Sequence, residues 1–497
     1  MSLATYLVVA FGFAAGGWLT RGRGTVGTVV GLGGLVVATI AAIAIRPDDI
    51  LPIGEAGLAA SAYLRLFLVM GSLVGLGLAI SGLAGGARRD MSTVTLATLG
   101  IASLTLSLTD PRAAVIAGTA GGLCGALLAV GRGGDRAGAS IGIRDLRAVV
   151  IAGTMAVAAM AWMGRDLSQL DAPPVVFGLA YLAVALAVAI RLGAIPFHLW
   201  VARLTDAVPD AGLPIATILA AAPFAVVGLG WADTSVAPLP VDLGTERGIV
   251  LAIAVASIIL AAIAAVIQDD LEHVVGYSIV GDAGVALLAL VALDPEAWGP
   301  ARTWILALVV TRSAFAAWAA GLRLSFGTGR IVELRGWLVR SPVSAVAFGL
   351  VVLASLGFPG LAAFEARSTL VAAAIDGPFA TLVVVGVLAP VAYYGRLLAV
   401  GLRRPDGPPE PGAWRPQVAP VNLTAPGEWW RKTWEANRAF TGALVAALLA
   451  LLAVSAAGGA FGGPEAAAAA AAAGPVPAAS LVPLPSEEPS FEPIPTE

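Results

Sequence analysis

The chain has 497 residues, of which 58% are hydrophobic and 12% charged, and its mean hydropathy is +0.90. A soluble domain carries roughly 25% charged residues, so the composition excludes a soluble globular protein and indicates a polytopic membrane protein. The net charge of −3, without a basic cluster, argues against nucleic acid as a partner. The single cysteine, Cys124, lies in an apolar segment, which excludes a disulfide framework and a cysteine-ligated cluster.

Long apolar segments follow one another along most of the chain. A membrane span needs about 20 such residues, and the sequence predicts about fourteen transmembrane helices. The predicted spans are 3–19, 25–45, 62–84, 93–109, 112–131, 146–164, 174–197, 213–232, 248–267, 271–293, 303–322, 343–372 (broken), 378–400 and 438–461. The first lacks a basic leader and a clear cleavage site, so we interpret it as a retained helix rather than a signal peptide.

Charges alternate between the two sets of connections. Arginines gather after spans one, three, five and eleven: Arg21, Arg23, Arg88, Arg89, Arg132, Arg136, Arg144, Arg147, Arg330, Arg335 and Arg340. The connections on the opposite side are acidic or nearly neutral: Asp48, Asp49, Glu55, Asp171, Asp233, Asp242, Asp294 and Glu296. Because positive charge marks cytoplasmic loops, we expect a multi-pass protein of the cytoplasmic (inner) membrane with both termini on the non-cytoplasmic side.

Two of the apolar segments contain a proline beside charged residues. The first reads Arg191-Leu-Gly-Ala-Ile-Pro196-Phe197-His198-Leu-Trp200, and the second reads Leu356-Gly-Phe-Pro359-Gly-Leu-Ala-Ala-Phe364-Glu365-Ala-Arg367. Proline breaks or kinks a helix, and in a membrane the freed carbonyls need protein or a wet cavity. Paired broken helices in two halves of a chain are typical of a transporter site. Pro196 and Pro359 are therefore predicted helix breaks, although each could simply kink a packed helix.

Four motifs between about Val94 and Val400 resemble one family. Arg191–Trp200 is similar to a K-x4-PFHxW signature, and Pro214–Pro223 is similar to the helix that follows it. Gln268–Gly284 resembles a Q-x-D-L-K-R-L-L-A-Y-S-S-I-x-H-x-G stretch, and Leu356–Arg367 resembles a G-I-P-P-x-A-G-F-x-x-K segment. These motifs are those of the antiporter-like membrane subunits of NADH–quinone oxidoreductase (subunits L, M and N), with related hydrogenases and multisubunit cation/proton antiporters.

The resemblance implies an all-α fold with two inverted five-helix repeats, each holding a Pro-broken helix. It divides the helical part of the chain into three N-terminal helices (1–90), a first repeat (91–232), a second repeat (233–400) and a last helix (438–462). The Pro- and Trp-rich segment 401–437 is predicted to be an interfacial loop, and the Ala-, Pro- and Glu-rich segment 463–497 a disordered tail. The resemblance also implies a membrane-arm subunit associated with proton translocation coupled to quinone reduction. Its partners would be other membrane subunits of a respiratory-type complex, and NADH, FMN, Fe–S clusters and quinone would lie in those partners, with no cofactor in this chain.

The sequence departs from the row of Lys, Glu and His that moves protons in that family. Arg191 and Arg367 occupy the positions of the two broken-helix lysines, and Phe224 occupies that of a third lysine. The expected acid of span five falls near Thr119, and the expected histidine of span ten is Asp282. A lysine can lose its proton when it is buried, whereas an arginine cannot. The family's path is therefore either rewired or lost in this chain.

Partial substitutes for the row are present. The mid-membrane candidates are Arg191, His198, Asp282, Arg312, Glu365 and Arg367. Arg312 is a plausible partner of Asp282, and the alternative is that the two form a purely structural ion pair. For His198 the alternative to a role in the path is that it merely caps the freed carbonyls. We predict no catalytic group and no convincing strands. We also predict no metal site, since two histidines about 75 positions apart make no ligand set. The alternatives are a structural, non-conducting subunit of such a complex and a subunit of a cation/proton antiporter.

Overall fold

The computed structural model describes residues 2–23, 25–47, 49–53, 56–85, 91–130, 136–163, 174–357, 359–375, 384, 386–404 and 440–454. The predicted tail (463–497) and all of the predicted interfacial loop except residues 401–404 lie outside this part of the chain.

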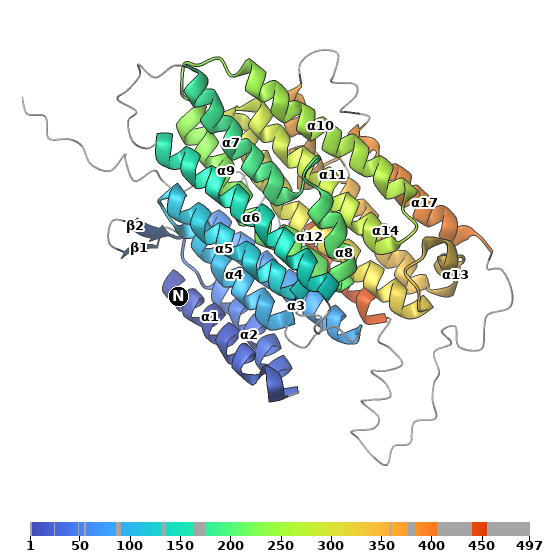
Figure 1. Cartoon of the computed structure of the whole chain (residues 1–497). Coiled ribbons are helices and arrows are strands. Elements are labelled where there is room, and N and C mark those ends of the chain that lie inside the picture. Colours follow the sequence, from blue (N-terminus) through green and yellow to red (C-terminus); the bar gives the residue numbers. More distant parts are fainter. Residues whose placement is uncertain are drawn as a thin grey trace, which may run out of the picture.

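The protein is a nearly all-helical, polytopic membrane protein (Figure 1). The helices are α1 (Leu3–Thr20), α2 (Thr25–Ile43), α3 (Ala62–Ala84), α4 (Met91–Ser107), α5 (Pro111–Val130), α6 (Arg136–Met163), α7 (Pro174–Leu192), α8 (Leu199–Ala207), α9 (Ala220–Trp231), α10 (Gly244–Ile267), α11 (Leu271–Ala292), α12 (Pro295–Phe326), α13 (Trp337–Arg340), α14 (Pro342–Leu356), α15 (Ala362–Ala374) and α17 (Pro390–Leu402). Short turns η1 (Arg21–Arg23), η2 (Asp210–Gly212), η3 (Ile215–Leu219), η4 (Ala232–Val236) and η5 (Ile331–Leu334) join them.

Ten helices in the described residues are long and apolar enough to cross a membrane. Shorter apolar helices occupy Met91–Ser107, Pro342–Leu356, Gly386–Leu402 and Phe440–Val454. The number of about fourteen crossings and the inverted repeats stay predictions.

Both proline segments interrupt a helix. α7 ends at Leu192 and α8 begins at Leu199, with Pro196 between them, and α14 ends at Leu356 while α15 begins at Ala362 beyond Pro359. At the second interruption Gly357 and Gly360 have φ angles of 67° and 91°, a left-handed conformation that glycine adopts at no steric cost. The chain can therefore turn there before the next helix starts.

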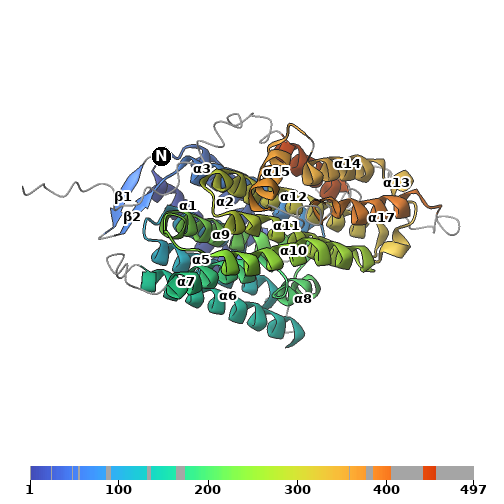
Figure 2. The ribbon, with the colours of Figure 1, turned by 90° about the horizontal axis from the view of Figure 1, so that it is seen from above.

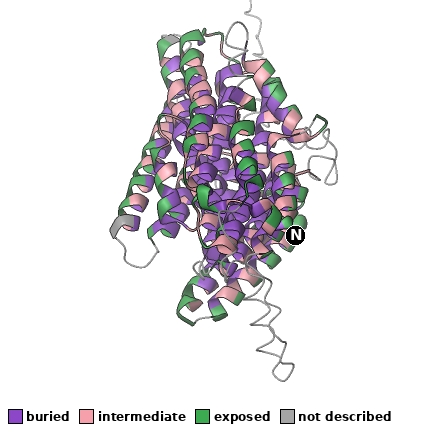
Figure 3. Cartoon of the chain, turned by 90° about the vertical axis from the view of Figure 1, so that its right-hand side faces the viewer, coloured by how far each residue is buried: buried purple, intermediate pink, exposed green. Residues whose placement is uncertain are grey.

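The bundle is elongated, and the chain crosses it from one end to the other. The N-terminal pair α1 and α2 lies at one end beside α4, and α14 and α17 lie at the opposite end (Figures 1 and 2). Buried residues gather in the middle helices, whereas exposed positions follow the outer ones (Figure 3). α12 is the central element, since it has 32 residues, a length of about 48 Å, and packs against α3, α11, α14 and α15.

Small residues let the central helices approach closely. A Cβ built on Gly284 of α11 would lie 2.6 Å from the backbone oxygen of Ala254 in α10. A Cβ on Gly75 of α3 would lie 2.4 Å from Thr95 Cγ2 of α4. Close packing of this kind replaces the hydrophobic effect, which does not drive helices together in lipid.

One expectation was wrong, because the described residues include strands. β1 (Ile50–Ile53) pairs antiparallel with β2 (Ala56–Ala59), and the backbone N of Gly57 donates to Thr109 Oγ1 at 3.0 Å. Each strand has only four residues and β1 contains Pro52, so the alternation of apolar and polar residues that indicates a strand was too short to be recognised. The hairpin covers the end of α4 that precedes α5.

Candidate functional site

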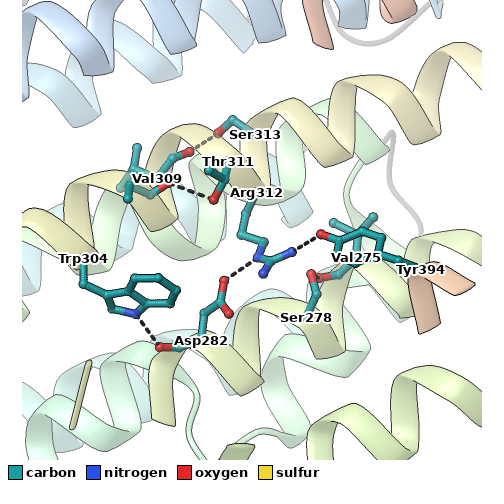
Figure 4. Close-up of polar contacts among 10 residues, drawn as sticks. Val275, Ser278, Asp282, Trp304, Val309, Thr311, Arg312, Ser313 and Tyr394 are labelled. Atoms are coloured by element: carbon teal, nitrogen blue, oxygen red, sulfur yellow. Dashed lines mark hydrogen bonds and ion pairs between the residues drawn. The ribbon is translucent and has the colours of Figure 1, made fainter. Parts of the chain in front are cut away.

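Among the residues that the structure describes, an ion pair between two buried side chains joins α11 to α12. Arg312 Nε lies 2.5 Å from Asp282 Oδ2, and Arg312 Nη1 donates to the hydroxyl of Tyr394 at 2.7 Å (Figure 4). Arg312 is 1% exposed and Asp282 6% exposed. The structure therefore brings together Asp282 and Arg312, the two candidates that the sequence suggested as partners.

Packing fixes the members of this pair. The indole nitrogen of Trp304, two turns before Arg312 on α12, donates to the backbone oxygen of Asp282 at 3.1 Å. The ring of Tyr394 packs against Phe315 and Phe348, with centroid distances of 5.4 and 5.8 Å. Because these contacts join four helices, α11, α12, α14 and α17, the guanidinium has little freedom to turn away from the carboxylate.

Arg367 lies beside the second helix interruption. It is 7% exposed, and its Nη2 donates to the backbone oxygen of Leu356, the last residue of α14, at 2.5 Å. A helix C-terminus carries partial negative charge, so this contact ties α15 to the end of α14. Glu365 is exposed, and its Oε1 accepts from the backbone N of Gly360 at 3.2 Å. Glu365 therefore caps the loop and does not join Arg367 in the interior.

A small cavity of about 20 Å³ lies between these groups. Its wall includes Asp282, Arg367, Ser278, Ser355 and Tyr393. The remaining lining residues are Ile258, Ala262, Tyr277, Gly281, Val285, Gly386, Val387 and Pro390. A polar cavity of this size holds about one water-sized guest.

The first interruption has its own buried arginine. Arg191, the second-last residue of α7, is 1% exposed, and its Nη2 donates to the backbone oxygen of Ala220 at 3.1 Å. Its guanidinium carbon lies 5.9 Å from the ring centre of Phe224. Phe224 therefore offers Arg191 an aromatic face, but no group that could exchange a proton.

Asp145 is the charged partner that sequence reasoning missed. It is 1% exposed within α6 and attracts Arg191 electrostatically, and its Oδ1 has no hydrogen-bond partner in the part of the chain that the structure describes. The Nε of Arg191 has none either. The sequence placed span six at 146–164 and so left Asp145 in a loop, whereas α6 begins at Arg136. The available signal was the helical spacing of apolar residues around Asp145 from Ile141 to Val149.

His198 and Pro196 lie in the gap between α7 and α8. The broken turn is satisfied by other groups: Trp200 Nε1 donates to the oxygen of Ile190 at 3.1 Å, and Ser257 Oγ accepts from the backbone N of Ile195 at 2.9 Å. His198 makes no capping bond, its Nδ1 has no partner, and its ring centre lies 6.1 Å from that of Tyr277. Since Tyr277 lines the cavity, His198 lies next to a residue of the cavity wall without lining the cavity itself.

Ionic contacts also join the predicted first repeat (91–232) to the predicted second repeat (233–400). Arg323 of α12 lies 2.5 Å from Glu272 of α11 and 3.2 Å from Asp210 of η2, and His273 lies 3.5 Å from Asp206 of α8. Glu272 and His273 are both half-buried.

Altogether the interior offers fixed positive charge at both interruptions and carboxylates beside it. The guanidinium groups of Arg191, Arg312 and Arg367 keep their protons, so they are fixed charges in the interior. Among the residues that the structure describes, no group of three or more His, Cys, Asp or Glu side chains could hold a metal ion.

Comparison with known proteins gives a matching family model and several similar membrane subunits. The family model described as NADH:quinone oxidoreductase/Mrp antiporter, TM, matches residues 151–391. NADH-quinone oxidoreductase subunit N 1 from Acidiphilium cryptum is 29% identical over 227 residues, which cover 45% of this chain and 46% of that protein. The chain thus spans about half the length of the curated relatives it matches.

Solved structures share the fold over most of their length. A chain of the Mrp complex from a Dietzia species has a TM-score of 0.72 and 17% identity, covering 96% of this chain and 98% of that one. A chain of respiratory complex I from Thermus thermophilus with bound aureothin has a TM-score of 0.65 and 17% identity, covering 90% and 98%. At this identity the likeness establishes the fold.

Proposed function

We propose that this chain, which belongs to the NADH:quinone oxidoreductase/Mrp antiporter family of membrane subunits, serves in the membrane arm of an NADH–quinone oxidoreductase-type complex. The complex translocates protons while it reduces quinone, and it lies in the bacterial inner membrane with both termini of this chain outside the cytoplasm. Two inverted repeats, 91–232 and 233–400, would each hold one of the interrupted helices. NADH, FMN, Fe–S clusters and quinone would be bound by partner subunits.

The observation that carries the local role is the pairing of buried arginines. Arg312 is held by Asp282 and Tyr394, and Arg191 by the carbonyl of Ala220. A guanidinium that keeps its proton cannot relay one. We infer that proton conduction through this chain is impaired and that its arginines act as fixed charges within the membrane arm.

Isolation of the native complex tests the assignment. The chain is purified gently from its own membranes, and the attached proteins are identified by mass spectrometry. We expect peripheral Fe–S and flavin subunits together with other membrane subunits. Isolation with small membrane subunits alone would contradict the redox assignment. It would support the second candidate, a cation/proton antiporter assembly, which is suggested by the likeness to a chain of the Mrp complex.

The impaired relay is tested on the reconstituted complex. We expect Arg191→Ala to lower the yield of assembled complex, because it removes a side chain that bridges α7 to Ala220. The number of protons moved per electron should stay unchanged in the complex that does assemble. A fall in that ratio at normal yield would show that Arg191 belongs to a working proton path.

A further inference from the structure

The cavity beside Asp282 is surrounded by more positive than negative charge. Asp282 and Arg367 line it, and Arg312 lies directly behind Asp282, at 2.5 Å. One carboxylate thus faces two guanidinium groups, and Arg312 already occupies an oxygen of that carboxylate. No other carboxylate lines the cavity in the described part of the chain, and Glu365 is exposed. Within the part of the chain that the structure describes, one buried positive charge is left without a counter-ion.

The contacts of Arg367 do not remove this excess. Its hydrogen bond goes to the neutral backbone oxygen of Leu356, which supplies only the partial charge of a helix end. An isolated charge within a membrane protein is costly and is normally paired. A neutral water would solvate the guanidinium but would leave the charge in place.

Two hydroxyl groups in the cavity wall also lack partners. Ser355 is 4% exposed and Tyr393 is 2% exposed, and neither side-chain oxygen has a hydrogen-bond partner among the described residues. The hydroxyl of Ser278, by contrast, donates to the oxygen of Val275 at 2.7 Å. Since a hydroxyl and a guanidinium both donate, the unpartnered groups form a donor-rich wall suited to an acceptor.

We propose that this cavity binds one small monovalent anion of the halide class as the counter-ion of Arg367. The volume of about 20 Å³ admits a guest close to water in size, so chloride fits and larger organic anions do not. Arg367 supplies the charge, and Ser355 and Tyr393 supply donors. The inference rests on charge and hydrogen bonding in this chain alone, and it does not depend on the complex to which the chain belongs.

Thermal unfolding of the purified full-length chain in detergent tests the site. Sodium chloride, bromide or gluconate is titrated at constant ionic strength, because a ligand of the folded state raises the unfolding temperature saturably. We expect chloride and bromide, but not gluconate, to do so. Arg367→Gln should weaken the apparent halide affinity at least tenfold, and Ser355→Ala severalfold.

Arg396→Gln is the matched control. This half-buried arginine of α17 also donates to backbone oxygens, those of Val266 and Gln268, but it lies outside the cavity. Its variant should keep the halide response. An equal response to gluconate, or an unchanged halide response in Arg367→Gln, would overturn the proposal.

Bromide-soaked crystals of the wild-type chain give a second measurement that needs no variant. We expect an anomalous scattering peak within the cavity, beside Arg367 and Ser355. Density of water size without an anomalous signal would show that the cavity holds water alone, and would overturn the proposal even if Arg367→Gln fails to fold. Neither result bears on which proteins are isolated with the native complex. The anion-site proposal and the proposed function can therefore be contradicted independently.

Discussion

Buried arginines occupy both helix interruptions of this chain, and each has a different kind of compensation. Arg191 has a carboxylate near it, Asp145, yet atoms on both side chains lack hydrogen-bond partners. Arg367 has a helix end and a polar cavity. Buried polar groups are normally bonded to protein or ordered water. For Arg191 the described residues supply the charge of Asp145 and the backbone oxygen of Ala220.

The first prediction concerns this pair. Asp145→Asn should lower the free energy of unfolding by about 1–3 kcal/mol, since it leaves the buried guanidinium of Arg191 without its charged neighbour. The measurement is denaturant or thermal unfolding of the purified chain in detergent. The double variant Asp145→Asn/Arg191→Gln should recover part of the loss, because it removes the uncompensated charge.

Asp110→Asn provides the control for that measurement. Asp110 is also paired with an arginine, Arg112, at 3.0 Å, but the two side chains are 32% and 51% exposed. An exposed pair contributes little, so this variant should change stability by less than about 0.5 kcal/mol. Equal effects of the two substitutions would contradict the idea that Asp145 and Arg191 interact in the interior.

At the scale of helices, the sequence was informative where a segment carries its own signal. Long apolar runs predicted the long apolar helices. Pro196 and Pro359, with the glycines near them, indicated the segments in which α7 and α14 end. The motifs also led to the family whose model matches residues 151–391. Each of these signals is local, because helix length and proline chemistry depend on the neighbouring residues.

The sequence was less informative where a residue's role depends on another helix. Asp145 looked like a loop residue until α6 proved to begin at Arg136. Glu365 is only two residues from Arg367 in sequence, yet it faces the loop while Arg367 faces the interior. The β1–β2 hairpin is stabilised by Thr109, which is 52 residues away from Gly57. None of these contacts follows from spacing along the chain.

At the scale of the whole molecule, ionic contacts at one end tie the two predicted repeats together. Asp210 and Asp206 come from the first repeat, and Glu272, His273 and Arg323 come from the second. Elsewhere the halves meet mainly through apolar packing, with the buried bond from Tyr181 to the oxygen of Leu290 at 2.7 Å as a polar exception. Among the residues that the structure describes, Arg323 is the arginine through which charge links the two predicted repeats, beside the contact of His273 with Asp206.

Replacing that arginine should weaken the link in a salt-dependent way. Arg323→Ala leaves Asp210 and Glu272 facing each other without the cation between them, and we expect a loss of about 0.5–1 kcal/mol in unfolding free energy at low salt. The loss should shrink at about 1 M salt, where the Debye length falls to about 3 Å. Arg330→Ala is the control, since Arg330 pairs with Glu333 at 3.8 Å and both are more than half exposed. If the two variants are equally stable at low salt, the contacts of Arg323 do not hold the halves together, and apolar packing alone must do so.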